Sequence, residues 1–533
     1  VQLIHQKTEG NPFFANEFLK ALHQEGFLHF DCETRQWQWD LAQIEARGIT
    51  DDVVELMVDK LRQLPPATQT AMSLAACVGA TFDLSTLAII AHQSREAVHT
   101  SLAAALRAGF VNPISKLDPE LLIQSYRFGH DRIQQAAYAL IPDQQRQQTH
   151  LEIGRSLVQQ LNQTEQSDRC FEIADHLNQS VDLITDSPER LALAQLNLHA
   201  AQKAKTSLAY IAALEYVSAG TDLLNTDIWA QGAALGLALY RARVDIEYLC
   251  GHFDTALVWI DAALAKARTD LEKADIYTQQ MVLYVLSGDY VAGVETTYKA
   301  FAHLAIEVPL ANPEAEAQRL REEINTYLED HAIDDLMALP RMTDPAKMLA
   351  MKLLDELLPA TYVAKPELFS WVISKLVVYS IEYGLHPSSF HGFSCYGMLL
   401  VFEENYPDAY AFGNIALQLA QAWNEHLQIS RTAHVLSAFL MSWVKPVRLS
   451  DDIQRLVKAD LTYMGYSHAE CFGNKLLGGF TIEAMLDEVR VIDHDLAAFE
   501  NKYTEVITAV FRFSLLTLQG TPEEQIRGDG HIW

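Results

Sequence analysis

The feature that most constrains the fold is the helical spacing of apolar residues from about residue 145 to the end of the chain. Apolar residues recur there at intervals of three and four positions, which places them on one face of an α-helix. Gly and Pro fall between these segments and not inside them. With 24 Gly and 17 Pro in 533 residues, the chain also has fewer turn residues than an all-β array of this size would need. The sequence therefore predicts a succession of helices.

A short motif, an aromatic residue followed three positions later by a small one, recurs in this region. It occurs at 210–213, 253–256 and 290–293, with a degenerate copy at 406–409. The repeat length is near the period of about 34 residues of tetratricopeptide helix pairs, in which the small residue lets two helices cross closely. We therefore expect tetratricopeptide-like helix pairs over residues 146–310 and 346–533. The segment between them, 311–345, is predicted to be a charged insertion or linker with an exposed helix.

The first part of the chain has a different organisation. Helical spacing predicts helices near 53–64, 68–78, 84–92 and 95–107, then two extended segments at 110–114 and 123–128 and a helix at 130–140. Helices followed by a β-hairpin are the order of a winged helix, so a winged-helix domain is expected over residues 49–145, with a wing loop between the two extended segments. The helical spacing of apolar residues predicts a helix over residues 13–25. The alternation of apolar and polar residues around 27–39 predicts a β-hairpin.

Charge and apolar content exclude several function classes. The formal net charge of −29 disfavours binding to phosphate backbones or anionic lipid. The helix that would enter DNA, Arg95–Arg107, has its arginines at its ends and an apolar middle, so no nucleic-acid partner is predicted. No apolar run reaches the roughly 18 residues of a membrane span. Six scattered cysteines indicate a reducing compartment and a cytoplasmic protein.

Catalytic motifs are missing from the sequence. It contains no Gly-x-x-x-x-Gly-Lys-Ser/Thr phosphate loop and no Gly-x-Ser-x-Gly nucleophile motif. His386, His391 and Cys395 lie within ten residues of one another, but the aromatic residues around them favour a helix–loop–helix junction over a metal site. No catalytic residue and no metal ligand is therefore predicted.

Several longer sequence segments resemble one family of proteins. Residues 9–14, 37–39, 48–50 and 126–138 resemble large bacterial signalling proteins of the cyanobacterial type, and 189–197 and 339–347 are similar to the same family. Those proteins join a serine/threonine kinase domain to an AAA-like signal-transduction NTPase and a helical repeat region. The resemblance implies a mostly α fold: the lid of the NTPase with a β-hairpin over residues 1–48, then the winged helix, then an α-solenoid of tetratricopeptide-like pairs.

Two sites follow from this resemblance. Gly10, Asn11 and Pro12 resemble the glycine-x-proline motif of such NTPases, whose proline packs against adenine. His130 and Asp131 resemble a histidine–aspartate pair whose histidine contacts the β-phosphate of ADP. The sequence leaves simpler alternatives open, because Pro is favoured in the first turn of any helix. Asp131 could likewise be an N-cap beside a half-buried His130.

The resemblance implies a regulatory and scaffold segment of an ATP-dependent signal-transduction protein, a serine/threonine or histidine kinase or both, with an AAA-like ATPase. No complete catalytic centre is expected in this chain. ATP or ADP would bind together with an upstream NTPase core, and the Mg contacts would lie outside this chain. The expected partners are the upstream kinase and NTPase domains, and a protein or small-molecule signal on the helical repeats. The missing initiator Met suggests a fragment of a longer protein. Two alternatives remain at this point: a winged-helix transcription regulator, and an enzyme with a pocket in its helical repeats.

Overall fold

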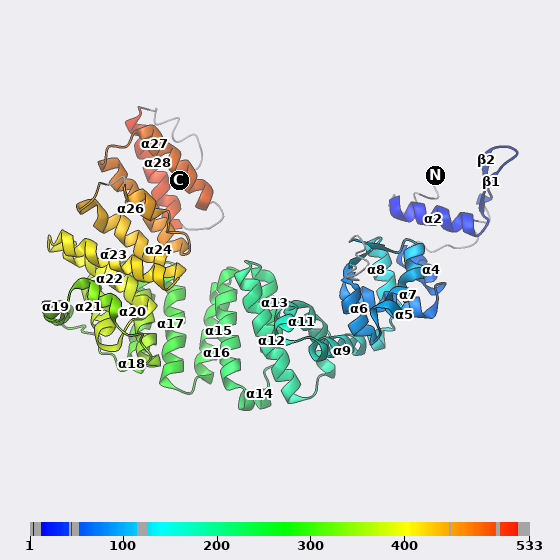
Figure 1. The fold of residues 1–533 in the computed structure, drawn as a ribbon, viewed down its shortest axis with the longest axis horizontal. Helices are drawn as coiled ribbons and strands as arrows, with labels where there is room; N and C mark the ends of the chain where they lie inside the picture. Colours follow the sequence, from blue (N-terminus) through cyan, green and yellow to red (C-terminus); the bar gives the residue numbers. More distant parts are fainter. Residues whose placement is uncertain are drawn as a thin grey trace. The chain divides into compact units, whose positions relative to one another are not determined.

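The computed structural model describes residues 4, 12–41, 44, 53–114, 125–446, 449–496 and 502–520. The chain divides into two compact units, Val1–His252 and Phe253–Trp533. Both units are mainly helical, which confirms the fold class expected from the sequence (Figure 1). None of the helices in the described ranges is both long enough and apolar enough to cross a membrane.

The first unit begins with a helix and a hairpin. Helix α2 spans Pro12–Gln24, and strands β1 (Leu28–Asp31) and β2 (Gln36–Trp39) pair antiparallel, as the sequence predicts. The turn between the strands forms because the Asp31 carboxylate accepts the backbone N–H of Glu33 at 2.8 Å. An ion pair between Glu17 of α2 and Lys60 ties this region to the next helix.

Five helices and a small sheet follow. The helices are α4 (Val53–Arg62), α5 (Pro66–Val78), α6 (Leu84–Ala91), α7 (Arg95–Arg107) and α8 (Asp131–Ala139). The antiparallel sheet has the order β3-β5-β4, with β3 at Thr81–Asp83, β4 at Val111–Pro113 and β5 at Ser125–Phe128. The sequence predicts β4 and β5 but not β3. The expected wing loop lies at 115–124, outside the described residues.

Aromatic residues join this sheet to the helices. The rings of Phe82 and Tyr126 stack with centroids 5.7 Å apart, and Phe128 packs against Phe82 at 5.6 Å. All three belong to one buried cluster with Met57 and Leu61 of α4. The hydroxyl of Ser94 caps α7 by accepting the backbone N–H of Ala97. The sheet therefore shares one core with helices α4–α8.

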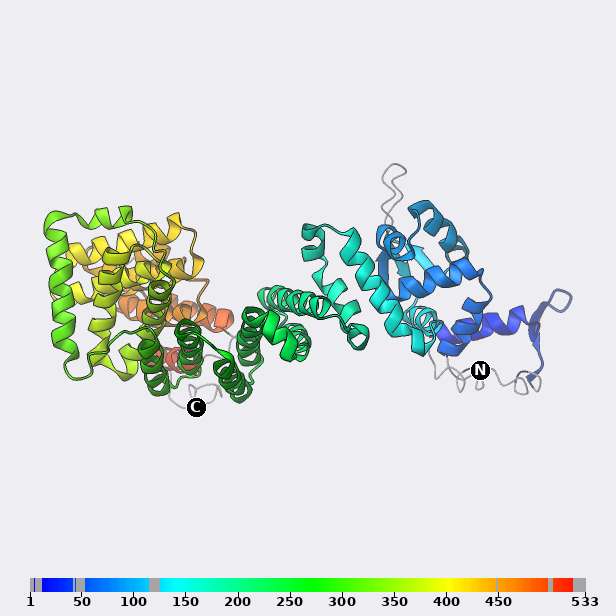
Figure 2. The ribbon, with the colours of Figure 1, turned by 90° about the horizontal axis from the view of Figure 1, so that it is seen from below.

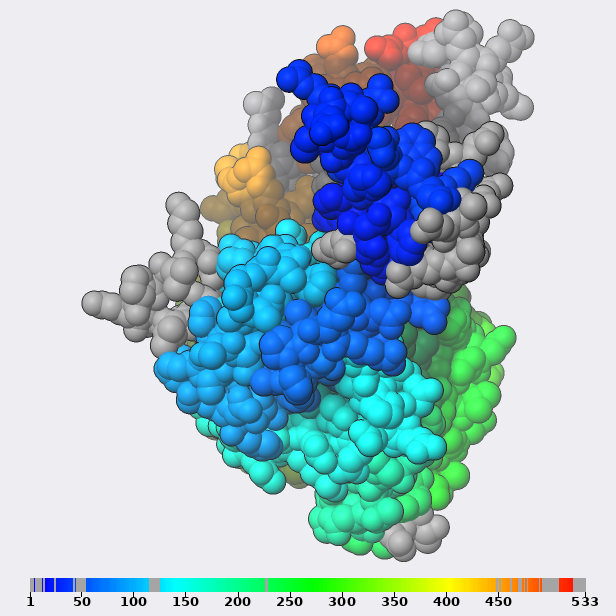
Figure 3. Space-filling view, turned by 90° about the vertical axis from the view of Figure 1, so that its right-hand side faces the viewer, coloured from blue at the N-terminus to red at the C-terminus, as the bar shows by residue number. Residues whose placement is uncertain are grey.

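The remainder of the first unit is helical. Its elements are α9 (Asp143–Gln160), α10 (Gln163–Asp168), α11 (Cys170–Asn178), η1 (Val181–Leu183), α12 (Ser187–Thr206), α13 (Tyr210–Asp222), α14 (Thr226–Gln231) and α15 (Ala233–Leu249). Ile90 of α6 lies in one buried cluster with Leu151, Ile173 and Leu198, so the core is continuous from α6 into these helices. In Figure 3 the blue surface of α4–α7 runs without a break into the cyan surface that follows.

The named elements of the second unit are all helices, joined by loops. They are α16 (Phe253–Lys266), α17 (Asp270–Leu286), α18 (Tyr290–His303), α19 (Pro313–Asp330), η2 (Ile333–Ala338), α20 (Pro345–Ala364), α21 (Pro366–Tyr383), α22 (Pro387–Phe402), α23 (Tyr406–Ala422), α24 (His426–Val435), η3 (Leu436–Leu440), η4 (Met441–Trp443), α25 (Ser450–Gln454), α26 (Leu461–Leu477), α27 (Ile482–Leu496) and α28 (Lys502–Leu518). Helices α17–α23 pack as neighbours around one large core (Figure 2).

The aromatic–small motif marks a repeated helix start. In each copy the aromatic residue is the first residue of a helix and the small residue is buried: α13 with Ala213, α16 with Ala256, α18 with Gly293 and α23 with Ala409. The residue two positions before each aromatic has a left-handed backbone, with φ between 59° and 84°: Leu208, Gly251, Gly288 and Glu404. The next N–H then bonds a carbonyl five residues back, which ends the preceding helix.

One expectation from the sequence is wrong: Gly and Pro do occur inside helices. Pro359 lies within α20, and Gly397 and Gly413 lie within α22 and α23. The glycines are needed because a Cβ on either would approach Leu440 Cδ1 to 2.9 Å or less. Close helix packing has overridden helix propensity here.

The charged segment near 311–345 forms the helix that the sequence predicts, but it is only partly exposed. Helix α19 buries Ala317, Leu320 and Ile324 completely and packs against α21. Its charged face carries Arg319, which pairs with Glu316 and Glu323. An amphipathic helix buries its apolar stripe whatever its overall charge, so α19 is part of the core of the second unit.

Candidate functional site

His130 lies at the N-terminus of α8. Its backbone is extended, and its Nδ1 accepts the backbone N–H of Arg132 at 3.2 Å. The N-cap is therefore His130, and not Asp131 as in the simpler alternative from the sequence. Asp131 is exposed in the first helical turn, where its negative charge interacts favourably with the positive end of the helix dipole. Because Nδ1 is an acceptor, the proton of the neutral ring sits on Nε2, which makes that nitrogen a donor.

Pro12, the other candidate residue described, is the first residue of α2 and is exposed. Gly10 and Asn11 lie outside the described residues. Both Pro12 and His130 belong to elements that contact α4: α2 through the Glu17–Lys60 ion pair, and α8 through direct packing. Helix α4 therefore contacts both of the helices at whose N-termini the candidate residues lie.

A chain of buried and half-buried polar groups leads from α8 into the helical repeats. The hydroxyl of Tyr138 lies 3.1 Å from His150 Nε2, and His150 Nδ1 lies 2.8 Å from His176 Nδ1. Arg169 adds a second link, because its guanidinium donates to Thr86 Oγ1 of α6 at 2.8 Å. Together with the shared core around Ile90, these bonds join α6 and α8 directly to α9 and α11.

The charge states of the two histidines follow from their burial. Burial, together with His150 and Arg169, lowers the pKa of His176 to about 4. Burial also lowers the pKa of His150. Both rings are therefore neutral at pH 7. Two neutral imidazoles can share one proton between facing nitrogens, whereas two imidazolium ions would repel each other.

A buried charge cluster lies in the second unit, where the sequence analysis predicted no functional site. The carboxylate of Asp355 accepts from His391 Nδ1 at 2.6 Å, from Gln428 Nε2 at 2.9 Å and from Arg431 Nη1 at 3.2 Å. Arg431 also donates to Glu356 and Asp460 at 3.0 Å. These groups come from α20, α22, α24 and the segment before α26.

The members of this cluster fix each other's charge. Burial raises the pKa of Asp355, but the charge of Arg431 and the hydrogen bond from His391 outweigh it and hold that pKa well below its usual value. Burial lowers the pKa of His391, but Cys395 and the carboxylate of Asp355 raise it to about 10. At pH 7 the cluster therefore contains an imidazolium and a guanidinium facing carboxylates.

His386, by contrast, belongs to a helix junction. It is the N-cap of α22, and its Nδ1 accepts the backbone N–H of Ser388. The helix–loop–helix interpretation of this segment is confirmed by α21 ending at Tyr383 and α22 beginning at Pro387. Within the described ranges, no three His, Cys, Asp or Glu side chains converge as metal ligands would.

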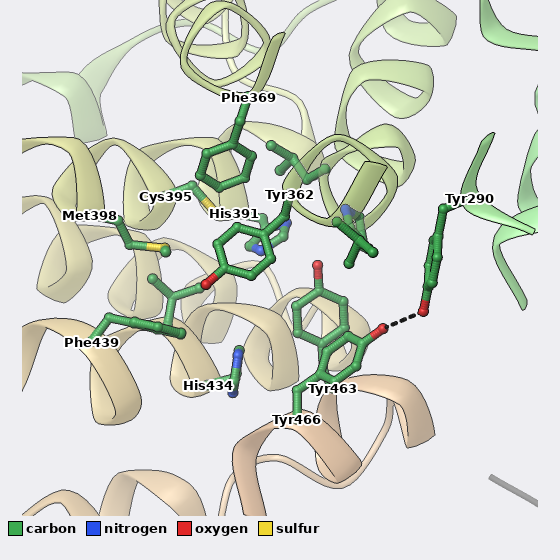
Figure 4. Close-up of a pocket in the computed structure, with 14 residues that line it drawn as sticks. Tyr290, Tyr362, Phe369, His391, Cys395, Met398, His434, Phe439, Tyr463 and Tyr466 are labelled. Carbon is green, nitrogen blue, oxygen red and sulfur yellow. Dashed lines mark hydrogen bonds between the residues drawn. The ribbon is translucent and has the colours of Figure 1, made fainter. Parts of the chain in front are cut away.

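The charge cluster borders a pocket. A cavity of about 200 Å³ opens between α18, α20, α21, α22, α24, η3 and α26 (Figure 4). Its lining residues are mostly aromatic and aliphatic: Tyr290, Leu358, Pro359, Tyr362, Val363, Phe369, His391, Cys395, Met398, His434, Val435, Phe439, Tyr463 and Tyr466. The Tyr290 and Tyr466 hydroxyls meet at 3.4 Å. An apolar pocket with a few convergent polar groups has the composition of a small-molecule site.

The sequence analysis missed Asp355, Arg431 and His434. A signal was present, because Asp355 stands among Leu353, Leu354 and Leu357, which are core residues of α20. A charge on the core face of a helix requires a buried partner. The partner itself could not be identified, since Arg431 lies 76 residues further along the chain.

Comparison with known proteins places the chain near signalling proteins. No protein-family model matches it. It is 24% identical to the hybrid signal transduction histidine kinase G of Dictyostelium discoideum over an alignment of 612 residues, which covers 98% of this chain and 18% of that protein. The chain thus spans under a fifth of the length of that relative.

One similar solved structure is that of a signal transduction ATPase with numerous domains and a tetratricopeptide repeat sensor, from Pyrococcus horikoshii. The alignment covers 90% of this chain and 64% of that one, with 11% identity and a TM-score of 0.42. At this TM-score the likeness adds nothing to the fold described above.

Proposed function

We propose that this chain is a regulatory and sensing segment of an ATP-dependent signal-transduction protein that includes a kinase. Its helical repeats receive a signal, and its first part passes that signal to a nucleotide-binding core elsewhere in the protein. The similarity to a hybrid histidine kinase over nearly the whole chain supports this class. Cys32, Cys77, Cys170, Cys250 and Cys395 are free thiols, which fits the cytoplasmic location that we propose.

The observation that carries the proposal is the direct connection between α8 and the repeats. Tyr138 of α8 is hydrogen-bonded to His150, and the core around Ile90 continues into α9, α11 and α12. A displacement of the first repeat helices would therefore move α8 and the cap residue His130 with it. A packed core transmits such shifts because it deforms little.

His130 is chemically suited to the proposed nucleotide contact. Its Nε2 is a donor, as a phosphate oxygen requires, and it sits at the positive end of a helix. The carboxylate of Asp131 repels phosphate, so we assign Asp131 a role in stabilising the helix rather than in direct contact. Pro12 would pack against the adenine ring, as the last residue of the glycine-x-proline motif that begins with Gly10 and Asn11. Bound ADP or ATP, with its Mg ligands outside this chain, would supply the phosphates.

The structure of α7 does not favour the transcription-regulator alternative. Val98, Leu102 and Ala105 are buried, which leaves Arg95 and Arg107 at opposite ends of the helix. Glu96 is exposed between them. A surface with one carboxylate between two separated cations provides few donors for base edges.

The test uses the full-length protein that contains this chain, with His130→Ala and His130→Asp. Asp is a good N-cap, so His130→Asp preserves α8 but repels phosphate, whereas His130→Ala costs about 1 kcal/mol of cap energy. We expect both variants to lose bound ADP, measured by chromatography of the released nucleotide. If His130→Asp keeps its ADP, His130 is a structural cap and the nucleotide proposal is wrong.

A further inference from the structure

The pocket of the second unit contains a buried nitrogen without a partner. His434 is 5% exposed, and its Nδ1 makes no hydrogen bond within the described part of the chain. Its ring packs edge-on against Phe439 and Tyr463, and Figure 4 shows it beside the cavity. Leaving such a buried polar atom unpaired costs about 1–3 kcal/mol. A ligand group that reaches this nitrogen from the cavity would recover that energy.

The charge state of His434 restricts what that group can be. Burial and the charge of His391 lower the pKa of His434 to about 3, so the ring is neutral at pH 7. A neutral imidazole has one donor and one acceptor nitrogen. A hydroxyl can both donate and accept, so it satisfies Nδ1 whichever nitrogen carries the proton.

The backbone next to His434 departs from a regular helix. Helix α24 ends one residue after it, at Val435, and is followed by a π-helical segment, Leu436–Leu440, which carries the pocket residue Phe439. Short π segments inside helices are frequent at functional sites, where they re-aim side chains. Pro359, which also lines the pocket, lies inside α20, where it cannot donate a helical hydrogen bond. A π-helical segment and a proline-containing helix thus line the same cavity.

The charges around the cavity disfavour an ionic ligand. His391 lines the pocket, but its imidazolium is already paired with Asp355. The cluster as a whole holds three carboxylates against two cations, so an anion would be repelled. A cation would have to lie against the His391 imidazolium, and Arg431 already stacks on the Tyr463 ring at 5.3 Å. A neutral ligand is repelled neither by the carboxylates nor by the His391 imidazolium.

We propose that this pocket binds a neutral aromatic molecule that carries one hydroxyl, with its ring among Tyr362, Phe369 and Phe439 and its hydroxyl on His434 Nδ1. A cavity of about 150 Å³ with apolar walls is enough to hold benzene. The cavity of about 200 Å³ here has room for a larger ring system. The binding site does not depend on the nucleotide-linked switch, so either proposal can fail without the other.

The experiment compares two probes on the purified chain, 2-naphthol and naphthalene, which differ only by the hydroxyl. We expect 2-naphthol to bind with a stoichiometry of one and to bind about tenfold more tightly than naphthalene, as one hydrogen bond to a buried partner provides. Isothermal titration calorimetry measures both affinities. No saturable binding of 2-naphthol, or equal affinity for the two probes, overturns the proposal, and this comparison requires no variant to fold.

A variant then assigns the hydroxyl contact. His434→Phe keeps an aromatic ring against Phe439 and removes the nitrogen, so the affinity for 2-naphthol should fall about tenfold while that for naphthalene stays the same. His426→Phe changes an exposed histidine of the same helix and should leave both affinities unchanged. If His434→Phe binds 2-naphthol as tightly as the wild type, His434 is not the contact and the proposal is wrong.

Discussion

The imidazole Nδ1 of His391 lies 2.6 Å from Oδ1 of Asp355, and both side chains are almost completely buried. The two residues are 36 positions apart, on α22 and α20. Arg431 of α24 reaches the other oxygen of the same carboxylate. One carboxylate therefore joins three helices of the second unit and holds two cations in its interior.

Replacing Asp355 should destabilise the second unit strongly. Asp355→Asn leaves the charges of His391 and Arg431 without their shared partner, and breaking a buried ion pair costs about 3–5 kcal/mol. Hydrogen exchange of the α20–α24 amides, measured by mass spectrometry, reports the free energy of opening of this region. Asp452→Asn is the matched control, since Asp452 pairs with Arg455 on the surface. A loss below 1 kcal/mol for Asp355→Asn would show that the cluster is not a structural anchor.

The stability of the second unit should also fall at alkaline pH. The pKa of His391 is raised from 6.5 to about 10, so its stabilisation is complete below pH 6.5. It is lost as the pH rises from there through pH 10, because the folded protein then gives up a proton that the unfolded chain has already lost. We expect the difference in opening free energy between wild type and His391→Asn to shrink over this range. A constant difference would mean that His391 is neutral when folded.

Local patterns predicted the helices and the hairpin, because each depends on residues close in sequence. Strand β3 was not predicted, because its three residues, Thr81–Asp83, are too few to show an alternation of apolar and polar side chains. On sequence alone the motif at Tyr210, Phe253 and Tyr290 is only a sign of helix pairs, and the structure adds that each aromatic residue begins a helix.

The pocket could not have been predicted from spacing. Its polar residues come from helices that the sequence separates widely: Tyr290 and Tyr466 are 176 positions apart. Which helix packs on which depends on the complementarity of side chains over the whole core, and periodicity carries no such information. The candidate positions Pro12 and His130 came from a resemblance between sequences. Their geometry, including the His130 cap, became visible only in the structure.

Acid should loosen the junction between α8 and the repeats. His176 has its pKa lowered to about 4, so the neutral pair with His150 contributes fully above pH 6.5. That contribution is lost as the pH falls from 6.5 through 4, because the unfolded chain takes up protons that the folded pair resists. Hydrogen exchange of α9 and α11 should therefore be faster at pH 5 than at pH 7.5 after correction for intrinsic rates.

Substitution separates this effect from general acid sensitivity. His176→Leu removes one titrating ring, so the exchange of α9 and α11 should depend less on pH than in the wild type. His199→Leu is the control, because His199 is half-buried and contacts the hydroxyl of Ser167 instead. If the two variants respond to pH in the same way, the His150–His176 pair does not govern the junction.

The small residue of the repeated motif should tolerate no enlargement. Ala256 of α16 is fully buried, whereas Thr255 beside it is exposed. Ala256→Leu adds three carbon atoms where two helices meet, and overpacking of this kind typically costs 1–3 kcal/mol, so we expect a loss of about 2 kcal/mol. Thr255→Leu adds a side chain of the same size to the solvent side and should change the stability by less than about 0.5 kcal/mol. Thermal unfolding of both variants measures the difference, and equal melting temperatures would show that α16 does not cross its neighbour at Ala256.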